Sequence, residues 1–184
     1  MNNNTLKFIE AYSVRLEQID QQTMHLLREW RNQADIRKQM VNQNLITPAQ
    51  HLAWFKQIEQ AHNQQHFIIY YKQQAIGAIN IATEEASLQQ AQIAQVGLYI
   101  TEPKYKNNML AFAPSLAIND YAFQILNINQ LKSKVRQSNQ PAIKYNQQLG
   151  YQFNPLNDEF TEITLTADNY EQASKQLKNW LSRG

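Results

Sequence analysis

The segment from residue 135 to residue 151 holds the side chains of this 184-residue sequence whose types and spacing most clearly suggest chemistry. An apolar, β-favouring run ends at Asn139, and Pro141 then stands in the first turn of a short helix that a glycine ends. Tyr145 and Asn146 are neighbours on that helix, and both can donate a hydrogen bond to a ligand. Of the two, only the phenol carries an acidic proton. The segment therefore predicts a strand, a short helix and a second strand, with a candidate proton donor on the helix.

Strand and helix patterns along the rest of the chain must position this segment. Expected strands span residues 13–19, 67–71, 75–81, 93–100, 130–137, 161–166 and the residues from 151 onward. Expected helices span residues 20–40 with a break near Asn32, a stretch that starts at the capping box of Thr47, Pro48 and Gln50, residues 114–126, and a terminal amphipathic helix that Asp168 caps. The order predicts an α/β (α+β) domain over residues 13–166, preceded by a tail over residues 1–12 and followed by a packed helix over residues 167–184.

Composition narrows the class of protein. Hydrophobic residues make up 43%, charged residues 17%, and the net charge is +2 without a dense Lys/Arg stripe, so a nucleic-acid partner is not expected. The chain has no cysteine, which excludes disulfides and a cysteine nucleophile. His25, His62 and His66 show no ligand spacing with acids, so no metal site is expected. The sequence shows neither a signal-peptide pattern nor an apolar run of membrane-spanning length, which predicts a cytoplasmic protein without a membrane partner.

The strand, asparagine, Pro-Ala helix and glycine of residues 135–150 resemble the closing half of the acyl-CoA site in the GCN5-related N-acetyltransferase (GNAT) superfamily. The resemblance covers nearly the whole order of elements and implies the GNAT fold, a mixed, mostly antiparallel sheet splayed at its fourth and fifth strands, with flanking helices. It also implies acetyl-CoA as co-substrate, whose pantetheine arm hydrogen-bonds the open edge of the fourth strand. On this resemblance Leu98, Tyr99 and Ile100 form that edge, and Asn139 contacts the cofactor arm.

The resemblance places the cofactor pyrophosphate at residues 104–111, where the family carries glycines that let backbone N–H groups wrap the phosphates. Neither glycine is present in this sequence, although two lysines supply charge. Asn107 and Asn108 tolerate positive φ better than most residues, so the sequence still allows the turn. Pro114 predicts a late or kinked start of the next helix. The candidate cofactor-binding residues of this loop are Lys106, Asn107, Asn108, Met109, Leu110 and Ala111, and Asn146 joins them from the later helix.

Attack of an amine on a thioester leaves a thiolate that must gain a proton, and many members of the superfamily supply it from a tyrosine of the short helix. That tyrosine stands four residues after the alanine, which here is Ala142, so the count reaches Asn146. Tyr145 is one residue early and therefore about 100° round the helix. Asn146 can donate a hydrogen bond to the sulfur but cannot give up a proton. Because a thiol pKa of about 8.5 makes the thiolate a fair leaving group, water could protonate it.

The sequence gives a weaker signal for the general base of the reaction than for the fold. The acid often found early in the fourth strand of the superfamily is replaced by Gln95. Glu84 and Glu85 follow the preceding strand and could relay a proton through water, although surface acids are ordinarily only solvated. His51 is the preferred base, because imidazole titrates near neutrality.

Motifs in the first half of the chain, with two later ones, are similar to the nucleotide-amino-sugar N-acetyltransferases of pseudaminic acid synthesis. They are Leu27–Asn32, Ile36–Arg37, Met40, Ile46–Thr47, His51–Leu52, Gly97–Tyr99 and Asp120–Phe123. That resemblance implies an acceptor pocket lined by Arg31, His51 and Tyr99. An arginine fork suits diphosphate oxygens, a histidine can bond a sugar hydroxyl or take a proton, and a tyrosine can stack on the acceptor. The ordinary alternatives are a solvated helix-end cation, a surface histidine and a core tyrosine, and Trp30 and Trp54 follow core spacing.

The resemblance implies transfer of an acetyl group from acetyl-CoA to the 4-amino group of a nucleotide-linked sugar, UDP-4-amino-4,6-dideoxy-N-acetyl-β-L-altrosamine, by direct attack. Two alternatives stay open at this point. One is acetylation of a protein N-terminus or another small amine. The other is a non-catalytic acyl-CoA-binding domain, which would suit the missing glycines and the missing tyrosine. The terminal helix packs either on its own sheet or on a second subunit, so a homodimer also stays open.

Overall fold

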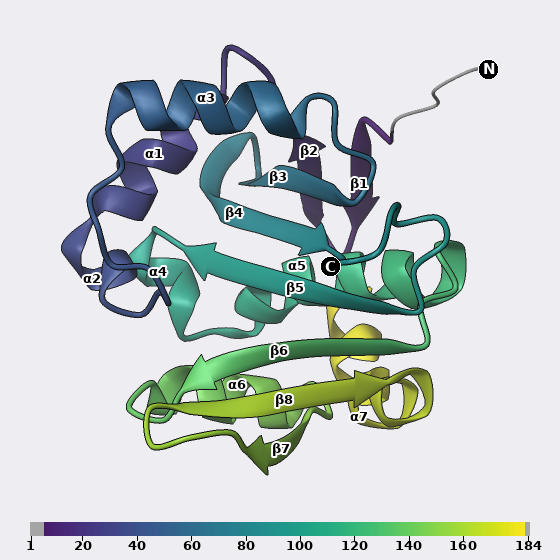
Figure 1. The fold of residues 1–184 in the computed structure, drawn as a ribbon. Coiled ribbons are helices and arrows are strands. Elements are labelled where there is room, and N and C mark those ends of the chain that lie inside the picture. Colours follow the sequence, from purple (N-terminus) through teal and green to yellow (C-terminus); the bar gives the residue numbers. More distant parts are fainter. Residues whose placement is uncertain (1–5, 183–184) are drawn as a thin grey trace.

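The computed structural model describes residues 6–182, which form an eight-stranded sheet with the order β1-β2-β3-β4-β5-β6-β8-β7 (Figure 1). Every neighbouring pair is antiparallel except β5 and β6, which run parallel. The strands are β1 (Phe8–Ala11), β2 (Val14–Gln18), β3 (Gln64–Tyr71), β4 (Gln74–Ala82), β5 (Ile93–Ile100), β6 (Gln130–Arg136), β7 (Gln152–Pro155) and β8 (Phe160–Thr166). The mixed, mostly antiparallel sheet predicted from the sequence is confirmed.

Helices flank this sheet. They are α1 (Met24–Asn32), α2 (Ala34–Arg37), α3 (Pro48–Ile58), α4 (Pro103–Lys106), the 3₁₀ turn η1 (Met109–Phe112), α5 (Ala113–Asp120), the π-helical turn η2 (Tyr121–Ile125), α6 (Gln140–Gln148) and α7 (Ala167–Leu181). The predicted break near Asn32 separates α1 from α2. The predicted capping box of Thr47 and Gln50 starts α3. None of the helices between residues 6 and 182 is both long enough and apolar enough to cross a membrane.

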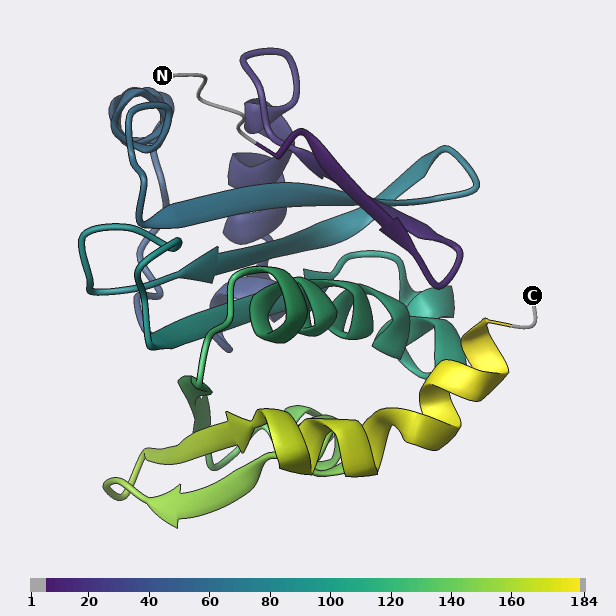
Figure 2. The same cartoon turned by 90° about the vertical axis from the view of Figure 1, so that its right-hand side faces the viewer.

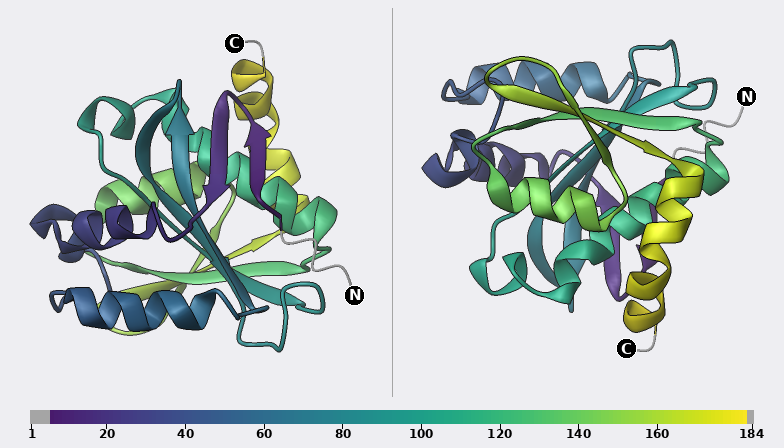
Figure 3. Two further views of the ribbon diagram at one scale, coloured as in Figure 1. Left: turned by 90° about the horizontal axis from the view of Figure 1, so that it is seen from above. Right: turned by 90° about the horizontal axis from the view of Figure 1, so that it is seen from below.

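The sheet lies between two layers of helices. Successive side chains of a strand point to opposite faces of the sheet, so each face packs against its own helices. On β3, Ile68 packs with Leu27 of α1 and Phe55 of α3, whereas Phe67 and Ile69 lie in the larger core with α5. Figure 3 shows α1 and α3 on one side of the strands and α5 on the other. The α1–α3 face therefore has its own small core, separate from the main one.

The sheet splays between β5 and β6, as the sequence predicted. The two strands share only the pairs Ile93 with Gln130 and Ala94 with Leu131. Beyond them β5 continues to Ile100 while paired with β4 alone. Figure 2 shows the β6–β8–β7 half lying apart from the β1–β5 half, with α5 beside the larger half. Within the described residues, the edge of β5 that faces β6 is thus free of strand partners from residue 95 onward.

The entry into α5 confirms the predicted late start. α4 ends at Lys106, the turn η1 follows, and α5 begins at Ala113 with Pro114 in its first turn. A proline is tolerated at that position because the first N–H groups of a helix have no partner within the helix. The same residue would have removed a hydrogen bond from a helix that began near Met109.

Two predictions about the ends of the domain need correction. Phe8–Ala11 form β1 and pair with β2, so part of the predicted tail over residues 1–12 is a strand, while residues 1–5 lie outside the described chain. The turn between the strands passes through Tyr12 and Ser13 at φ of 53° and 64°. At the other end, α7 is capped by Thr166, and Asp168 stands in its first turn without capping it.

The terminal helix α7 packs on the domain through its buried residues Tyr170 and Leu177. Asp120 at the end of α5 anchors it by accepting a hydrogen bond from the Tyr170 hydroxyl at 2.8 Å and an ion pair from Lys178 at 2.9 Å. The same carboxylate accepts from the Tyr12 hydroxyl at 2.5 Å. One acid thus joins α5, α7 and the β1–β2 turn.

Candidate active site

A pocket of about 480 Å³ opens on the α1–α3 face of the sheet. Its walls come from α1, α3, the connection between α2 and α3, and strands β3, β4 and β5. Arg31, His51 and Tyr99, the residues predicted to line an acceptor site, lie together in it. The full lining consists of Leu27, Arg31, Asn42, Asn44, Leu45, Ile46, Gln50, His51, Trp54, His66, Ala78, Ile79, Asn80 and Tyr99.

Arg31 and Tyr99 both line this pocket, and each has a buried polar atom without a partner within the described chain. Nη1 of Arg31 and the hydroxyl of Tyr99 are buried, and neither has a hydrogen-bond partner within residues 6–182. Burial lowers the pKa of Arg31 and raises the pKa of Tyr99, and each group partly offsets the shift of the other. A buried polar group without a partner costs about 1–3 kcal/mol. Arg31 and Tyr99 therefore each keep an unsatisfied polar atom at the border of the pocket.

His51 is held in one orientation at the base of α3. It is 5% exposed, and its Nε2 lies 2.7 Å from the carbonyl oxygen of Met24. Because a carbonyl only accepts, Nε2 carries a proton and donates it in this contact. The ring stacks on Trp54 with centroids 5.0 Å apart and 27° between the planes. His51 is thus buried and is not a surface helix residue, which was the ordinary alternative for it. Trp54, for which the spacing predicted a core role, lines the pocket.

His66 of β3 belongs to the pocket, although its sequence position gave no functional signal. Its Nε2 lies 2.9 Å from Oε1 of Gln64, and its ring meets Trp54 edge-on with centroids 5.0 Å apart. Burial lowers the pKa of His66 to about 4, so the ring is neutral at pH 7 and is a weak base. It supplies a polar, uncharged wall.

A row of residues crosses the sheet from the pocket to the splayed edge. His66, Asn80 and Gly97 stand opposite one another on β3, β4 and β5. The side chain of Asn80 lies over Gly97, since a Cβ at position 97 would come 2.7 Å from Oδ1 of Asn80. The missing side chain at Gly97 thus lets an amide reach the β5 edge. A glycine inside a strand pattern marks such a close approach, and that signal could have identified Asn80.

The connection between α2 and α3 forms the outer wall of the pocket. Asn32 clamps its end, because the side-chain Nδ2 donates to the carbonyl of Ile46 at 2.9 Å and Oδ1 accepts from the N–H of Ile46 at 2.8 Å. The neighbouring Arg31 lines the pocket itself. The adjacent arginine and asparagine thus have separate roles, one toward a ligand and one toward the wall.

The candidate cofactor edge of β5 carries Leu98, Tyr99 and Ile100. Tyr99 lines the pocket, whereas Leu98 packs against the main core and Ile100 is buried. Where the strands part, Gln95 donates to Oγ of Ser133 on β6 at 3.3 Å. Beyond that bridge the unpaired N–H and C=O groups of β5 suit an amide-bearing ligand arm.

The loop predicted to wrap a pyrophosphate does not use positive φ. Asn107 and Asn108 have φ of −121° and −132°, so neither residue adopts the left-handed conformation that the sequence allowed. Asn108 instead makes local hydrogen bonds, accepting from the N–H of Leu110 at 3.0 Å and donating to the carbonyl of Lys104 at 2.8 Å. Such side-chain bonds to the backbone are an alternative to a left-handed residue. The chain then passes through the 3₁₀ turn that runs from Met109 through Leu110 and the buried Ala111 to Phe112.

Two more loop and helix residues serve structural contacts. Lys106 pairs with Asp35 of α2 at 3.2 Å. Asn139 caps α6, because its Oδ1 accepts from the N–H of Ala142 at 3.3 Å. The capping contact is the ordinary role of an asparagine at a helix start.

The two proton-donor candidates of α6 point in different directions. The Tyr145 hydroxyl lies 2.9 Å from the carbonyl oxygen of Ala111 and 2.7 Å from Oγ of Ser115, and its ring stacks on Phe112. Burial raises the pKa of Tyr145. Asn146 donates from Nδ2 to the carbonyl of Ala142 on its own helix at 2.8 Å. Tyr145 thus joins α6 to the start of α5.

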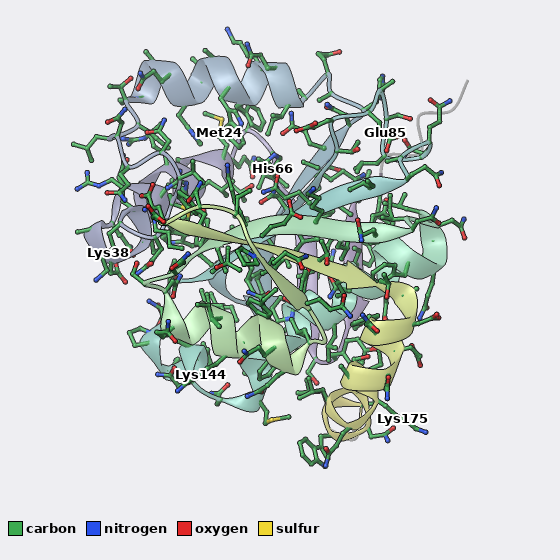
Figure 4. All side chains as sticks on the ribbon, turned by 60° about the horizontal axis from the view of Figure 1, so that its bottom comes forward. Met24, Lys38, His66, Glu85, Lys144 and Lys175 are labelled. Carbon is green, nitrogen blue, oxygen red and sulfur yellow. The ribbon has the colours of Figure 1, made fainter. Side chains whose placement is uncertain are left out.

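The acidic residues of the β4–β5 connection lie away from the pocket. Glu85 accepts from the backbone N–H groups of Gln92 and Ile93 at 2.7 and 3.2 Å, where β5 begins. From Ile93 to Tyr99 the strand rises roughly 20 Å, and Figure 4 shows Glu85 apart from His66. Across residues 6–182 no three His, Asp or Glu side chains gather as a metal site.

Known proteins share this fold and sequence pattern. A family model described as the acetyltransferase (GNAT) domain matches residues 14–152. Acetyltransferase PseH of Campylobacter jejuni is 28% identical over 154 residues in one strain (80% of this chain, 88% of the relative) and 30% identical over 135 residues in another (71% and 78%). The crystal structure of C. jejuni PseH with acetyl coenzyme A has a TM-score of 0.61 at 22% identity, covering 84% of this chain and 99% of that one. Apo FdhC, a nucleotide-linked sugar GNAT, has a TM-score of 0.75 at 17% identity, covering 95% and 98%.

Proposed function

The chain belongs to the acetyltransferase (GNAT) family, and from that premise we propose that its acceptor is the 4-amino group of a nucleotide-linked amino-deoxy sugar. Acetyl-CoA is the acyl donor, as in the family. The proposal therefore concerns the molecule that fills the pocket on the α1–α3 face.

The observation that carries the proposal is the charge of this pocket. Arg31 is the only side chain of permanent charge among the described lining residues, and no carboxylate lines the pocket between residues 6 and 182. A polyamine or a charged peptide amine would require acids at this wall, whereas a diphosphate requires a cation with free donors. The unpartnered Nη1 of Arg31 is such a donor. The pocket therefore favours an anionic acceptor.

The rest of the lining suits a sugar. Side-chain amides, which both donate and accept hydrogen bonds as hydroxyl groups do, come from Asn42, Asn44, Gln50 and Asn80. The stacked rings of His51 and Trp54 add a flat apolar wall. A volume of about 480 Å³ lies within the range of roughly 300–1,000 Å³ typical of small-molecule sites. FdhC, described as a nucleotide-linked sugar GNAT, supports the same substrate class, whereas the name of PseH says only that it is an acetyltransferase. We assign UDP-4-amino-4,6-dideoxy-N-acetyl-β-L-altrosamine as the specific acceptor.

The reaction is a direct transfer. The neutral amine attacks the thioester carbonyl carbon, a C–N bond forms, the C–S bond breaks, and coenzyme A leaves as a thiolate. Nε2 of His51 is engaged with the carbonyl of Met24, so Nδ1 is the nitrogen that would take the proton lost by the amine. Asn80, whose side chain reaches the β5 edge, holds the amine toward the thioester. Because a sugar amine is only weakly basic, positioning supplies most of the rate.

Release of free thiol from acetyl-CoA tests the proposal. The expected result is turnover with the UDP-linked 4-amino sugar and none above background with spermidine or with peptides bearing a free N-terminus. Turnover with peptides alone would assign the chain to N-terminal acetylation. Acetyl-CoA binding without turnover on any of the three acceptors would make it a non-catalytic acyl-CoA-binding domain.

A further inference from the structure

Arg136 at the end of β6 makes contacts that an ordinary surface arginine does not. Its side chain is only 11% exposed. Nε and Nη2 both donate to the carbonyl oxygen of Met40, at 3.2 and 2.9 Å. Nη1 pairs with the carboxylate of Glu159, and the guanidinium lies 4.7 Å from the centroid of Phe160. Each of the three guanidinium nitrogens thus has a partner, and two of them hold one backbone carbonyl.

That carbonyl belongs to the pocket wall. Met40 lies in the connection between α2 and α3, two residues before Asn42, the first lining residue of that connection. The other end of the lining stretch is fixed at Ile46 by Asn32. Residues 42–45 therefore lie between two hydrogen-bonded anchors, and they form neither a helix nor a strand.

The two anchors come from different halves of the molecule. Asn32 is on α1, over the β3–β5 half, whereas Arg136 is on β6, beyond the splay. Figure 1 shows the end of β6 and the α2 region at the same end of the sheet. The bonds from Arg136 to Met40 thus join the β6 side of the splay to the connection between α2 and α3.

We propose that Arg136 is a positioning residue for acceptor binding, which fixes the wall of residues 40–46 across the splayed strands. The proposal rests on the proposed function, since it assigns the acceptor to the pocket on the α1–α3 face. Arg136 itself does not line that pocket in the described chain. Its effect must therefore appear in acceptor binding through the wall and not in a direct contact.

Arg136→Met tests this, because methionine keeps the apolar stem over Phe160 and removes the fork. The KM for the acceptor should rise by about tenfold or more, the loss expected for a charge-assisted hydrogen bond to a wall that must then be ordered on binding. The dissociation constant for acetyl-CoA should stay within about twofold. Arg136→Lys, which restores one donor, should recover part of the loss.

Glu159→Gln is the matched control, since it removes the charge beside Arg136 and leaves both bonds to Met40 in place. Its acceptor KM should stay near that of the wild type. Equal changes of the acceptor KM and the acetyl-CoA affinity in Arg136→Met would overturn the proposal, as would an equal effect of Glu159→Gln.

Amide hydrogen exchange separates this proposal from the identity of the acceptor. In Arg136→Met the amides of residues 41–46 should exchange at least several-fold faster, with or without a known substrate. Unchanged exchange would overturn the proposal even if the nucleotide sugar is the acceptor. Faster exchange in a protein that does not acetylate the sugar would keep the anchor and reject the proposed function.

Discussion

Replacing Arg31 by methionine should make the ligand-free protein more stable and should weaken the binding of the acceptor. In the free protein Nη1 of Arg31 is buried without a partner within residues 6–182, and burial lowers the pKa of the group. Such a cation destabilises the empty pocket. Methionine keeps the apolar stem and removes the charged head, so packing along α1 is preserved.

The magnitudes follow from the two states of the pocket. An unsatisfied buried donor costs about 1–3 kcal/mol, and since only one of the three guanidinium nitrogens is in this state, we expect a gain in unfolding free energy of up to about 1 kcal/mol. Charge-assisted hydrogen bonds to a bound diphosphate contribute about 1.5–3 kcal/mol. Their loss corresponds to roughly a 10- to 150-fold rise in the acceptor KM.

Urea unfolding of the ligand-free protein gives the first number, and thiol-release kinetics with varied acceptor gives the second. Arg28→Met on the same helix is the control, because Arg28 does not line the pocket. In that variant the unfolding free energy, and the binding free energy calculated from the acceptor KM, should each change by no more than about 0.5 kcal/mol.

The argument would be refuted by a variant that loses stability without ligand, because Arg31 would then be a structural cation. It would be refuted equally by an Arg31→Met enzyme whose KM values for acceptor and acetyl-CoA rise together. Either result would return Arg31 to its ordinary role at a helix end.

Three further predictions test other parts of the structure. Gly97→Ala should fold but push the amide of Asn80 aside, since the new Cβ would lie 2.7 Å from its Oδ1; acceptor kcat/KM should fall on the order of tenfold, and an unchanged value would remove Asn80 from the site. The pKa of His66 is lowered from 6.5 to about 4, so between these pH values the unfolded chain binds more protons than the folded one. The unfolding free energy should therefore be highest above about pH 6.5 and fall by up to about 3 kcal/mol toward pH 4. Urea unfolding of His66→Asn should show a smaller fall over the same pH range. Asp120→Asn should cost about 2 kcal/mol by weakening bonds to two tyrosines and a lysine; the exposed Glu171→Gln should cost under about 0.5 kcal/mol in the same thermal or urea assay.

The parts of the fold that could be predicted are those with local signals. Thr47 and Gln50 mark the start of α3 because a capping box involves only residues three apart. Pro114 predicts the late start of α5 because the restriction acts within one turn. By contrast, β1 was missed, since its hairpin turn uses Tyr12 and Ser13 at positive φ in place of the Asn-Gly signature.

The candidate site was harder to predict, because its geometry depends on register between strands. Nothing near His66 in the sequence indicates that it lies opposite Asn80, or that Asn80 in turn lies over Gly97. Trp54 follows helical core spacing and yet stands at the border between core and pocket, where one ring contacts two histidines. Asn108 tolerates positive φ, but its side chain offers a competing local hydrogen bond, and that bond decides the turn.

The contacts of α6 bear on how the thiolate gains its proton. The Tyr145 hydroxyl is bonded to a backbone carbonyl and to Ser115, and burial raises the pKa of the phenol, so its proton is held and not poised for release. One N–H of Asn146 bonds its own helix, and the other can donate a hydrogen bond to the sulfur. A neutral amide does not transfer that proton to the thiolate. Both side chains are thus engaged by contacts within the protein, and their part in catalysis stays a prediction. Because coenzyme A is a fair leaving group, the loss of the usual tyrosine is small if the amine is already aligned with the thioester. On the function proposed above, the rate then depends on the groups proposed to fix the acceptor, which are Arg31 and Asn80 in the pocket and, through the wall, Arg136.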